Sequence, residues 1–145
     1  MAADCLFCGI VEGAQPAHVV IGTPDVLGFL DTRPVFKGHV LLVPRHHVPT
    51  YTDLPVSLIV PFFSAGQRVA AAMTTVLSAQ GSFVAMNNVV SQSVPHLHLH
   101  VVPRTKGDGL RGFFWPRTTY ADEVEAARYA AQLRDTLDGL TGEIA

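Results

Sequence analysis

The stretch His96-Leu97-His98-Leu99-His100-Val101-Val102 decides the fold of this 145-residue chain. Its three histidines alternate with aliphatic residues, and an alternation with period two is typical of a β-strand. We therefore expect the imidazoles to project from one face of a strand, about 6.6 Å apart, with the aliphatic side chains on the other face. Because imidazole can change protonation or act as a nucleophile near neutral pH, this row predicts a site for one phosphate or one metal ion.

Two other interpretations of this stretch are open. Histidine-rich runs often bind metal ions, and an amphipathic strand can present histidines to solvent by chance. Chance is a poor explanation, because three of the seven histidines of the chain fall within five residues. The aliphatic partners favour a shaped site over a loose chelating tract.

The composition is that of an ordinary globular domain. Hydrophobic residues make up 48% of the chain and charged residues 15%, which excludes a disordered protein. The formal net charge is −2, and no block of Lys and Arg occurs, so we expect no long nucleic acid as a partner. The N-terminus does not look like a signal peptide, and no uninterrupted apolar run reaches membrane-spanning length. We therefore expect a cytoplasmic protein that does not associate with a membrane.

The pattern along the chain predicts an α+β fold, a mostly antiparallel sheet of about five strands with helices packed against one side. A short helix or turn is expected at residues 5–12, and a long helix from about residue 54 to residue 80. Pro61 lies within the long helix and is expected to kink or split it. A C-terminal helix is expected at about 122–139. The strands are expected at 17–22, 26–31, 39–44, 82–87 and 96–103.

We expect a single domain over residues 1–145, because no internal repeat and no long linker divides the chain. Its core is expected at about 5–104, followed by a C-terminal extension at 105–145. The aromatic cluster Phe113-Phe114-Trp115-Pro116 lies in that extension and has no periodicity. We expect this cluster to belong to the core, to a dimer interface or, less readily, to a base-stacking surface.

The segment Cys5-Leu6-Phe7-Cys8 offers half of a zinc site, because zinc takes four ligands and two thiolates can supply two of them. His46 and His47 follow a predicted strand and are candidates for the remaining ligands. A packed N-terminal turn with free thiols and a redox pair are the alternatives. The availability of histidines favours zinc.

A polar loop at residues 88–95 leads into the histidine stretch. We expect its N–H groups and the side chains of Asn88, Gln92 and Ser93 to lie near the imidazoles, where neutral donors could stabilise a phosphate. An ordinary polar connection is the alternative. The segment Val89-Val90-Ser91 contains no glycine, so we expect the valines to hold the loop in an extended path.

Taken singly, three further residues have ordinary explanations. Asp31 fits a turn cap, His39 fits a structural histidine at the start of a strand, and His18 fits a surface histidine on an edge strand.

Together, these residues resemble the histidine triad (HIT) family of nucleotide hydrolases and transferases, from about Cys5 to Arg104. Residues 96–102 match the family signature His-φ-His-φ-His-φ-φ, in which φ is apolar. The third histidine is typical of the hydrolase branches, because the transferase relatives end in glutamine. Supporting matches are Phe29-Leu30-Asp31, Gly38-His39-Val40-Leu41-Leu42-Val43-Pro44-Arg45 followed by His47, Asn87-Asn88, and Gln92-Ser93-Val94.

The resemblance implies a hydrolase that cleaves a phosphoanhydride or phosphoramidate at the α-phosphate of a nucleotide and releases AMP or a similar product. It implies that His98 is the nucleophile of a nucleotidyl-histidine intermediate, that His100 donates to the phosphate, and that His39 and His96 complete the catalytic set. The implied nucleotide-binding residues are Asp31 at the ribose, Phe7, Ile10 and Phe29 at the base, and Asn88, Gln92, Ser93 and Val94 near the phosphate or leaving group.

The resemblance also implies a structural zinc ion on Cys5, Cys8, His47 and His96, with no organic cofactor. It implies a purine nucleotide as partner and a homodimer. Diadenosine polyphosphates and nucleoside phosphoramidates are the two substrate classes that it offers. A nucleotide- and zinc-binding module with little turnover is the alternative function.

Overall fold

The structure is a computed structural model that describes residues 4–111 and 118–140. The chain divides into two units, Met1–Asp108 and Gly109–Ala145. The second unit contains helix α3 (Glu123–Leu140), which agrees with the predicted C-terminal helix. The aromatic cluster at residues 113–116 lies outside the described residues, so its predicted role stays open.

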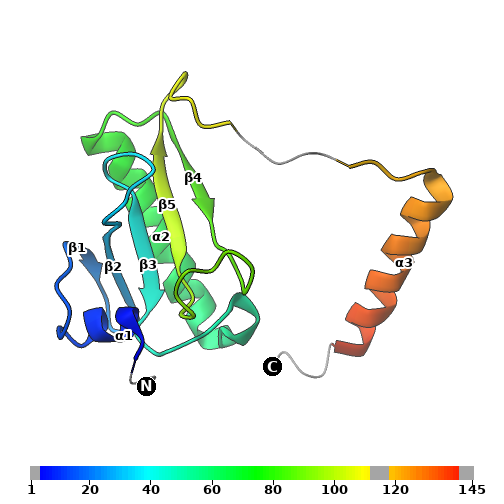
Figure 1. Cartoon of the computed structure of the whole chain (residues 1–145), viewed down its shortest axis with the longest axis horizontal. Coiled ribbons are helices and arrows are strands. Elements are labelled where there is room, and N and C mark those ends of the chain that lie inside the picture. The colour runs from blue at the N-terminus through cyan, green and yellow to red at the C-terminus, as the bar shows by residue number, and fades with distance from the viewer. Residues whose placement is uncertain (1–3, 112–117, 141–145) are drawn as a thin grey trace. The chain divides into compact units, whose positions relative to one another are not determined.

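The first unit is built on a five-stranded sheet in which every neighbouring pair of strands is antiparallel (Figure 1). The order across the sheet is β1-β2-β3-β5-β4. The predicted fold class is confirmed. The strands are β1 (Val19–Gly22), β2 (Val26–Leu30), β3 (Val40–Pro44), β4 (Gly81–Ala85) and β5 (Leu99–Arg104).

One face of the sheet is covered by α2 (Val56–Val76), the long helix behind the strands in Figure 1. Its buried residues recur at helical spacing and form one apolar stripe toward the sheet. Gly66 allows close packing, because a Cβ atom at this position would lie 3.0 Å from Cδ2 of Leu99. The buried stripe consists of Phe62, Ala65, Gly66, Val69 and Met73.

The extent of α2 differs from the prediction in two ways. The helix is not split at Pro61, since it runs unbroken from Val56 to Val76. Pro61 lies early in the helix, and the carbonyl that it leaves without a helical partner belongs to the exposed Ser57. The helix ends before residue 80 because Ser78 adopts a left-handed backbone conformation, with φ of 55°, a stop that is more often signalled by glycine.

By length and composition alone, α2 could cross a membrane. Its apolar residues are interrupted by Pro61, Ser64, Gln67 and Arg68, so no uninterrupted apolar run of that length occurs in it. Core helices of soluble proteins pass the same test, and α2 packs its buried stripe against the sheet.

The opposite face of the sheet is covered by α1 (Leu6–Val11). Phe7 of α1 packs into a second apolar cluster with Leu27, Phe29, Leu41 and Val43. The expectation that the helices lie on one side of the sheet is therefore wrong for α1. A helix of six residues has too short a pattern to indicate which face of the sheet it covers.

The histidine stretch is only partly a strand, because β5 begins at Leu99. His96 lies in a bend, and its N–H donates to the carbonyl of Val94 at 2.8 Å. The predicted strand at 96–103 is therefore wrong at its start. The bend follows Pro95, which has no N–H to offer to a neighbouring strand.

Candidate active site and metal cluster

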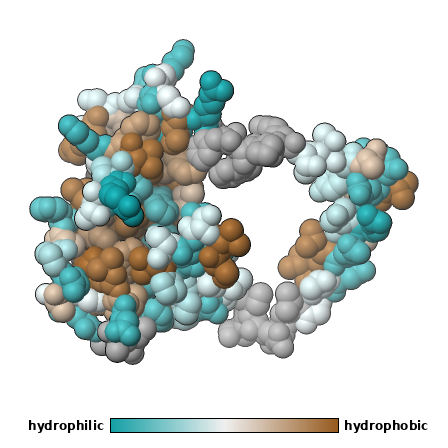
Figure 2. Space-filling model, viewed as in Figure 1, coloured by the Kyte–Doolittle hydropathy of each residue, from teal (hydrophilic) through white to brown (hydrophobic). Residues whose placement is uncertain are grey.

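A cleft of about 1120 Å³ opens on the sheet face that carries α1. On the face shown in Figure 2, apolar residues gather where α1 lies against the sheet, and polar residues surround them. The cleft has the size that small-molecule sites typically have, or slightly more. It brings together these residues predicted for the site: Phe7, Ile10, Phe29, Asp31, Ser93, Val94, His98 and His100.

Strand register explains how distant parts of the sequence meet in the cleft. Phe29 of β2 pairs with Leu41 of β3, and Leu41 pairs with His100 of β5. Directly opposed residues of paired strands share a face. Phe7 of α1 packs against these residues, with its ring centroid 5.5 Å from that of Phe29 and 5.2 Å from that of His98.

The His98 side chain is buried, and one hydrogen bond fixes its tautomer. Its Nδ1 lies 2.7 Å from the backbone carbonyl oxygen of His96. A carbonyl oxygen only accepts hydrogen bonds, so Nδ1 carries the proton and Nε2 keeps its lone pair. In the neutral ring, this tautomer presents on Nε2 the lone pair that an imidazole nucleophile needs.

Hydrogen bonds also fix which nitrogen carries the proton in His39 and in His100. The backbone N–H of Val35 donates to Nδ1 of His39 at 3.2 Å, so the proton of this ring is on Nε2. Nε2 of His39 then donates to Nδ1 of His100 at 2.9 Å. The remaining proton of His100 is consequently on its Nε2, which makes this atom a hydrogen-bond donor.

Both rings are held neutral by their surroundings. The pKa of His100 is lowered to about 4, chiefly by burial and also by the neighbouring His98 and His39, while Asp31 opposes the shift. Burial also lowers the pKa of His39, again against the effect of Asp31. The 3.6 Å contact between Nδ1 of His39 and Oδ2 of Asp31 is therefore not an ion pair near neutral pH.

Asp31 lines the cleft and is half-buried. Its Oδ1 accepts the backbone N–H of Arg33 at 2.8 Å, so the turn-cap explanation describes one of its two oxygens. Oδ2 has room to accept from a hydroxyl group in the cleft.

The loop before the triad contributes less to the cleft than expected. Oδ1 of Asn88 accepts the backbone N–H of Tyr51 at 2.6 Å. Gln92 donates from Nε2 to the carbonyl of Pro49 at 2.7 Å and accepts at Oε1 from the N–H of Val89 at 2.8 Å. These two side chains join the loop to the segment before α2 and do not line the cleft, whereas Ser93 does.

The path of this loop is not extended, so the prediction for Val89 and Val90 is wrong. Val89 has φ of 63° and Ser91 has φ of 61°. A left-handed conformation is unusual for a β-branched residue. Oδ1 of Asn88 and Oε1 of Gln92 accept backbone N–H groups, and Nδ2 of Asn87 donates to a backbone carbonyl. These bonds hold the turn and offset this cost.

Several cleft residues were not predicted. His18 lies just before β1 and Arg33 follows Asp31, and both line the mouth of the cleft. Their only sequence signal was proximity to Asp31 or to the first predicted strand. The other lining residues that the sequence did not indicate are Leu6, Pro16, Ala17, Leu30, Thr32 and Leu41.

Beside the cleft, Cys5, Cys8, His47 and His96 form a cluster whose ligand atoms all lie within 4.8 Å of one another. His96 Nδ1 is 3.5 Å from Sγ of Cys5 and 3.6 Å from Sγ of Cys8, and His47 Nδ1 is 3.3 Å from Sγ of Cys8. A tetrahedral zinc ion separates a sulfur and a nitrogen ligand by about 3.5 Å. The four residues therefore have the spacing of a closed metal site.

His96 also has the outer partner that a metal ligand requires. Its Nε2 donates to the carbonyl of Pro44 at 2.8 Å, which leaves Nδ1 free to face the thiols. The exposed His46 is not among the cluster residues. A second group, Asp31, His39 and His100, also lies within metal-ligand distance, but the two imidazoles there are hydrogen-bonded to each other.

A scan against protein families matches the HIT domain over residues 12–107. An uncharacterized HIT-like protein of Mycobacterium tuberculosis is 36% identical over 108 residues, 73% of this chain and 75% of that protein. An adenosine 5'-monophosphoramidase of Candida albicans is 32% identical over 120 residues, 79% of each chain.

A solved structure has a similar fold and a bound metal. The zinc-bound histidine triad family protein from Mycobacterium smegmatis superimposes with a TM-score of 0.71 at 36% identity, covering 94% of this chain and 96% of that one.

We predict that His100 stays neutral, with the proton on Nε2, down to about pH 5, because its pKa is lowered to about 4. Long-range ¹H–¹⁵N NMR of the imidazole nitrogens measures both the tautomer and the titration midpoint. The unfolded chain binds this proton near pH 6.5, so the free energy of unfolding should fall as the pH is lowered from about 6.5 to about 4. The variant His100→Gln should lose part of that pH dependence. A midpoint near 6.5 in the folded protein would contradict the prediction.

Proposed function

Because the chain belongs to the HIT family, we propose that it is a nucleotide hydrolase with His98 as its nucleophile. The observation that carries this proposal is the 2.7 Å hydrogen bond between Nδ1 of His98 and the carbonyl of His96. This bond leaves the lone pair of Nε2 free at a cleft that also contains His100 and Asp31. The phosphoramidase from Candida albicans supports a reaction of this class.

The proposed reaction has two displacements at the α-phosphorus. Nε2 of His98 attacks the phosphorus, the bond to the leaving group breaks, and the leaving group departs with its electron pair. Water then attacks the same phosphorus, the P–N bond breaks, and the nucleoside monophosphate is released. The carbonyl of His96 stabilises the positive charge that forms on the imidazole of His98, while Nε2 of His100 donates to the phosphate oxygens.

The walls of the cleft support a purine nucleotide as the substrate. Phe7, Ile10 and Phe29 offer an apolar surface for the base. Asp31 is proposed to accept hydrogen bonds from the ribose hydroxyls through its less occupied Oδ2. Diadenosine polyphosphates and adenosine phosphoramidate are the candidate substrate classes, and the likeness to a named phosphoramidase favours the second.

We further propose that Cys5, Cys8, His47 and His96 hold a structural zinc ion. The 3.3–3.6 Å separations between thiol and imidazole atoms support this assignment, as does the zinc-bound relative from Mycobacterium smegmatis. A zinc ion with four protein ligands has no open position for chemistry, so its role would be to fix α1 beside the base pocket.

A homodimer in the cytoplasm is proposed as the working state. Strand β4 is at an edge of the sheet and carries Val84, which is 47% exposed. Val56 and Val60 of α2 are also exposed, by 53% and 73%. Open strand edges beside apolar side chains are common places for pairing with another chain.

The second candidate function is a nucleotide- and zinc-binding module with little turnover. It is favoured by the bonds that Oδ1 of Asn88 and Nε2 of Gln92 make to the backbone of Tyr51 and Pro49, because these bonds hold both side chains at the segment before α2, outside the cleft lining. The two functions differ in whether a covalent intermediate forms on His98.

We predict that His98→Ala abolishes hydrolysis of both diadenosine polyphosphate and adenosine phosphoramidate, assayed side by side by product analysis, while AMP binding persists. In the parent protein, mass spectrometry after an alkaline quench should find a nucleotidyl group on His98, because P–N bonds survive alkali. Turnover at the parent rate in His98→Ala would exclude this nucleophile. Nucleotide binding without an intermediate or product would favour the binding module.

We predict that Ser93→Ala lowers kcat more than Asn88→Ala does, because Ser93 lines the cleft, whereas Oδ1 of Asn88 accepts the backbone N–H of Tyr51 in the segment before α2. Removing a donor that stabilises a transition state typically costs about a hundredfold in rate. Steady-state kinetics of the two variants on one substrate measure the difference. A larger loss in Asn88→Ala would mean that this side chain turns into the cleft when substrate binds.

We predict about one zinc ion per chain in protein that has not met acid or chelator. Elemental analysis of Cys8→Ser should find much less zinc, and the thermal midpoint of this variant should be lower than that of the parent. His46→Ala is the matched control, since it removes the neighbouring exposed imidazole and should keep the metal. Equal zinc in Cys8→Ser and the parent would refute the ligand assignment.

A further inference from the structure

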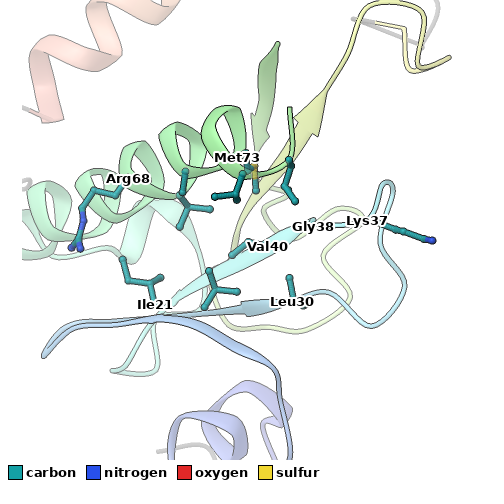
Figure 3. A pocket seen from close by; sticks show the side chains of 12 residues that line it. Ile21, Leu30, Lys37, Gly38, Val40, Arg68 and Met73 are labelled. Carbon is teal, nitrogen blue, oxygen red and sulfur yellow. The ribbon is translucent and has the colours of Figure 1, made fainter. Parts of the chain in front are cut away.

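A second cavity lies on the sheet face that α2 covers, away from the histidines. It has a volume of about 550 Å³ and lies between α2 and the strands β1, β2 and β3 (Figure 3). We call it the α2 groove. Its lining residues are Val20, Ile21, Leu30, Lys37, Gly38, Val40, Arg68, Val69, Ala72, Met73, Val76 and Leu77.

Every residue that lines the α2 groove is either apolar or cationic. Val40, Val69 and Met73 are buried and form its floor. Its rim exposes apolar side chains to water, among them Val76 at 74% and Val20 at 50%. Exposed apolar surface around a cavity of this size is typical of a binding site.

The two ends of the α2 groove differ. At one end, Gly38 and Leu77 are in close contact, since a Cβ atom on Gly38 would lie 2.5 Å from Cδ1 of Leu77. Gly38 has φ of 96°, which suits glycine, and the contact closes this end. At the other end, the Arg68 side chain reaches from α2 toward the side of Ile21 (Figure 3).

The two cations of the groove are also placed differently. The Lys37 ammonium points away from the cavity in Figure 3, whereas Arg68 borders its open end. Within residues 4–111 and 118–140, Arg68 has no hydrogen bond or ion pair with another side chain. Its guanidinium is therefore available to an anion, and no carboxylate lines the groove to repel one.

We propose that the α2 groove binds a free long-chain carboxylate. The carboxylate pairs with Arg68 at the open end, and the alkyl chain runs over Val69 and Met73 toward the closed end at Gly38 and Leu77. Charge complementarity selects an anion, because the Arg68 guanidinium borders the open end and no carboxylate lines the groove. The apolar floor and rim select an alkyl body, since covering them removes apolar surface from water.

The test measures binding of dodecanoate, below its micelle concentration, to the full-length chain by isothermal titration calorimetry. We expect saturable binding at one site per chain, about two- to fourfold tighter for each added methylene in a decanoate-to-tetradecanoate series. Arg68→Gln should weaken dodecanoate binding about tenfold. Lys37→Gln makes the same change in net charge at the other end and should leave binding within about twofold of the parent.

A second pair of variants tests the apolar body of the groove. Ala72→Phe places a large ring among the lining residues on an exposed helix position and should abolish binding. Ala71→Phe makes the same change at the neighbouring exposed position, which does not line the groove, and should bind like the parent. Circular dichroism spectra of all four variants check that the fold is retained.

Any of the following results would overturn the proposal. One is no saturable binding of dodecanoate to the parent. Another is an equal loss in Arg68→Gln and Lys37→Gln, or equal affinity for uncharged dodecanol, either of which would mean that no carboxylate subsite exists. The third is a change of molecular mass by analytical ultracentrifugation in Ala72→Phe alone, which would make the groove an interface between copies of this chain. None of these results depends on nucleotide hydrolysis.

Discussion

The hydrogen bond between the carbonyl of His96 and Nδ1 of His98 is the interaction on which the candidate active site depends. It exists because the chain bends at His96 and joins the sheet only at Leu99. In a regular antiparallel ladder that carbonyl would face a neighbouring strand. The bend lets one residue act in two places, since the backbone of His96 orients His98 while its side chain meets Cys5 and Cys8. The cluster of Cys5, Cys8, His47 and His96 and the proposed nucleophile are thereby joined through a single residue, and loss of the cluster would disturb the carbonyl that orients His98.

Much of the fold and the centre of the site were predictable from the sequence, because they rest on local periodicity. Alternation and turn residues indicated all five strands, and the histidine pattern indicated the residues at the floor of the cleft. The quartet Cys5, Cys8, His47 and His96 came from the resemblance, and spacing alone had left its completing ligands open. What failed depends on tertiary contacts. Placing α1 required knowing where Phe7 packs, and ending α2 required a left-handed serine that no sequence rule demands. His18 became a cleft residue only through the pairing of β1 with β2, which brings its carbonyl to the N–H of Leu30, and Arg33 through the turn at Asp31.

The loop before the triad shows why residue type alone misled the prediction. Valine prefers extended backbone, yet Val89 adopts φ of 63° because its N–H is captured by Oε1 of Gln92. Gln92 is in turn held by the carbonyl of Pro49. Such strain persists where surrounding interactions over-determine the conformation. Asn88 and Gln92, which the sequence suggested for phosphate binding, thus hold the loop instead. Ser93 and His100 therefore make more of the proposed contacts with the phosphate.

Successive side chains of strand β3 point to opposite faces of the sheet and so line two different cavities. Leu41 faces the histidine cleft, and the preceding Val40 faces the α2 groove. His39, one residue before the strand, shares the face of Leu41 and reaches His100. A slip of one residue in register would exchange these faces, so the packing of Val40 and Leu42 against α2 fixes the position of His39. The geometry of the proton chain from Val35 through His39 to His100 is therefore set by apolar packing on the opposite face of the sheet.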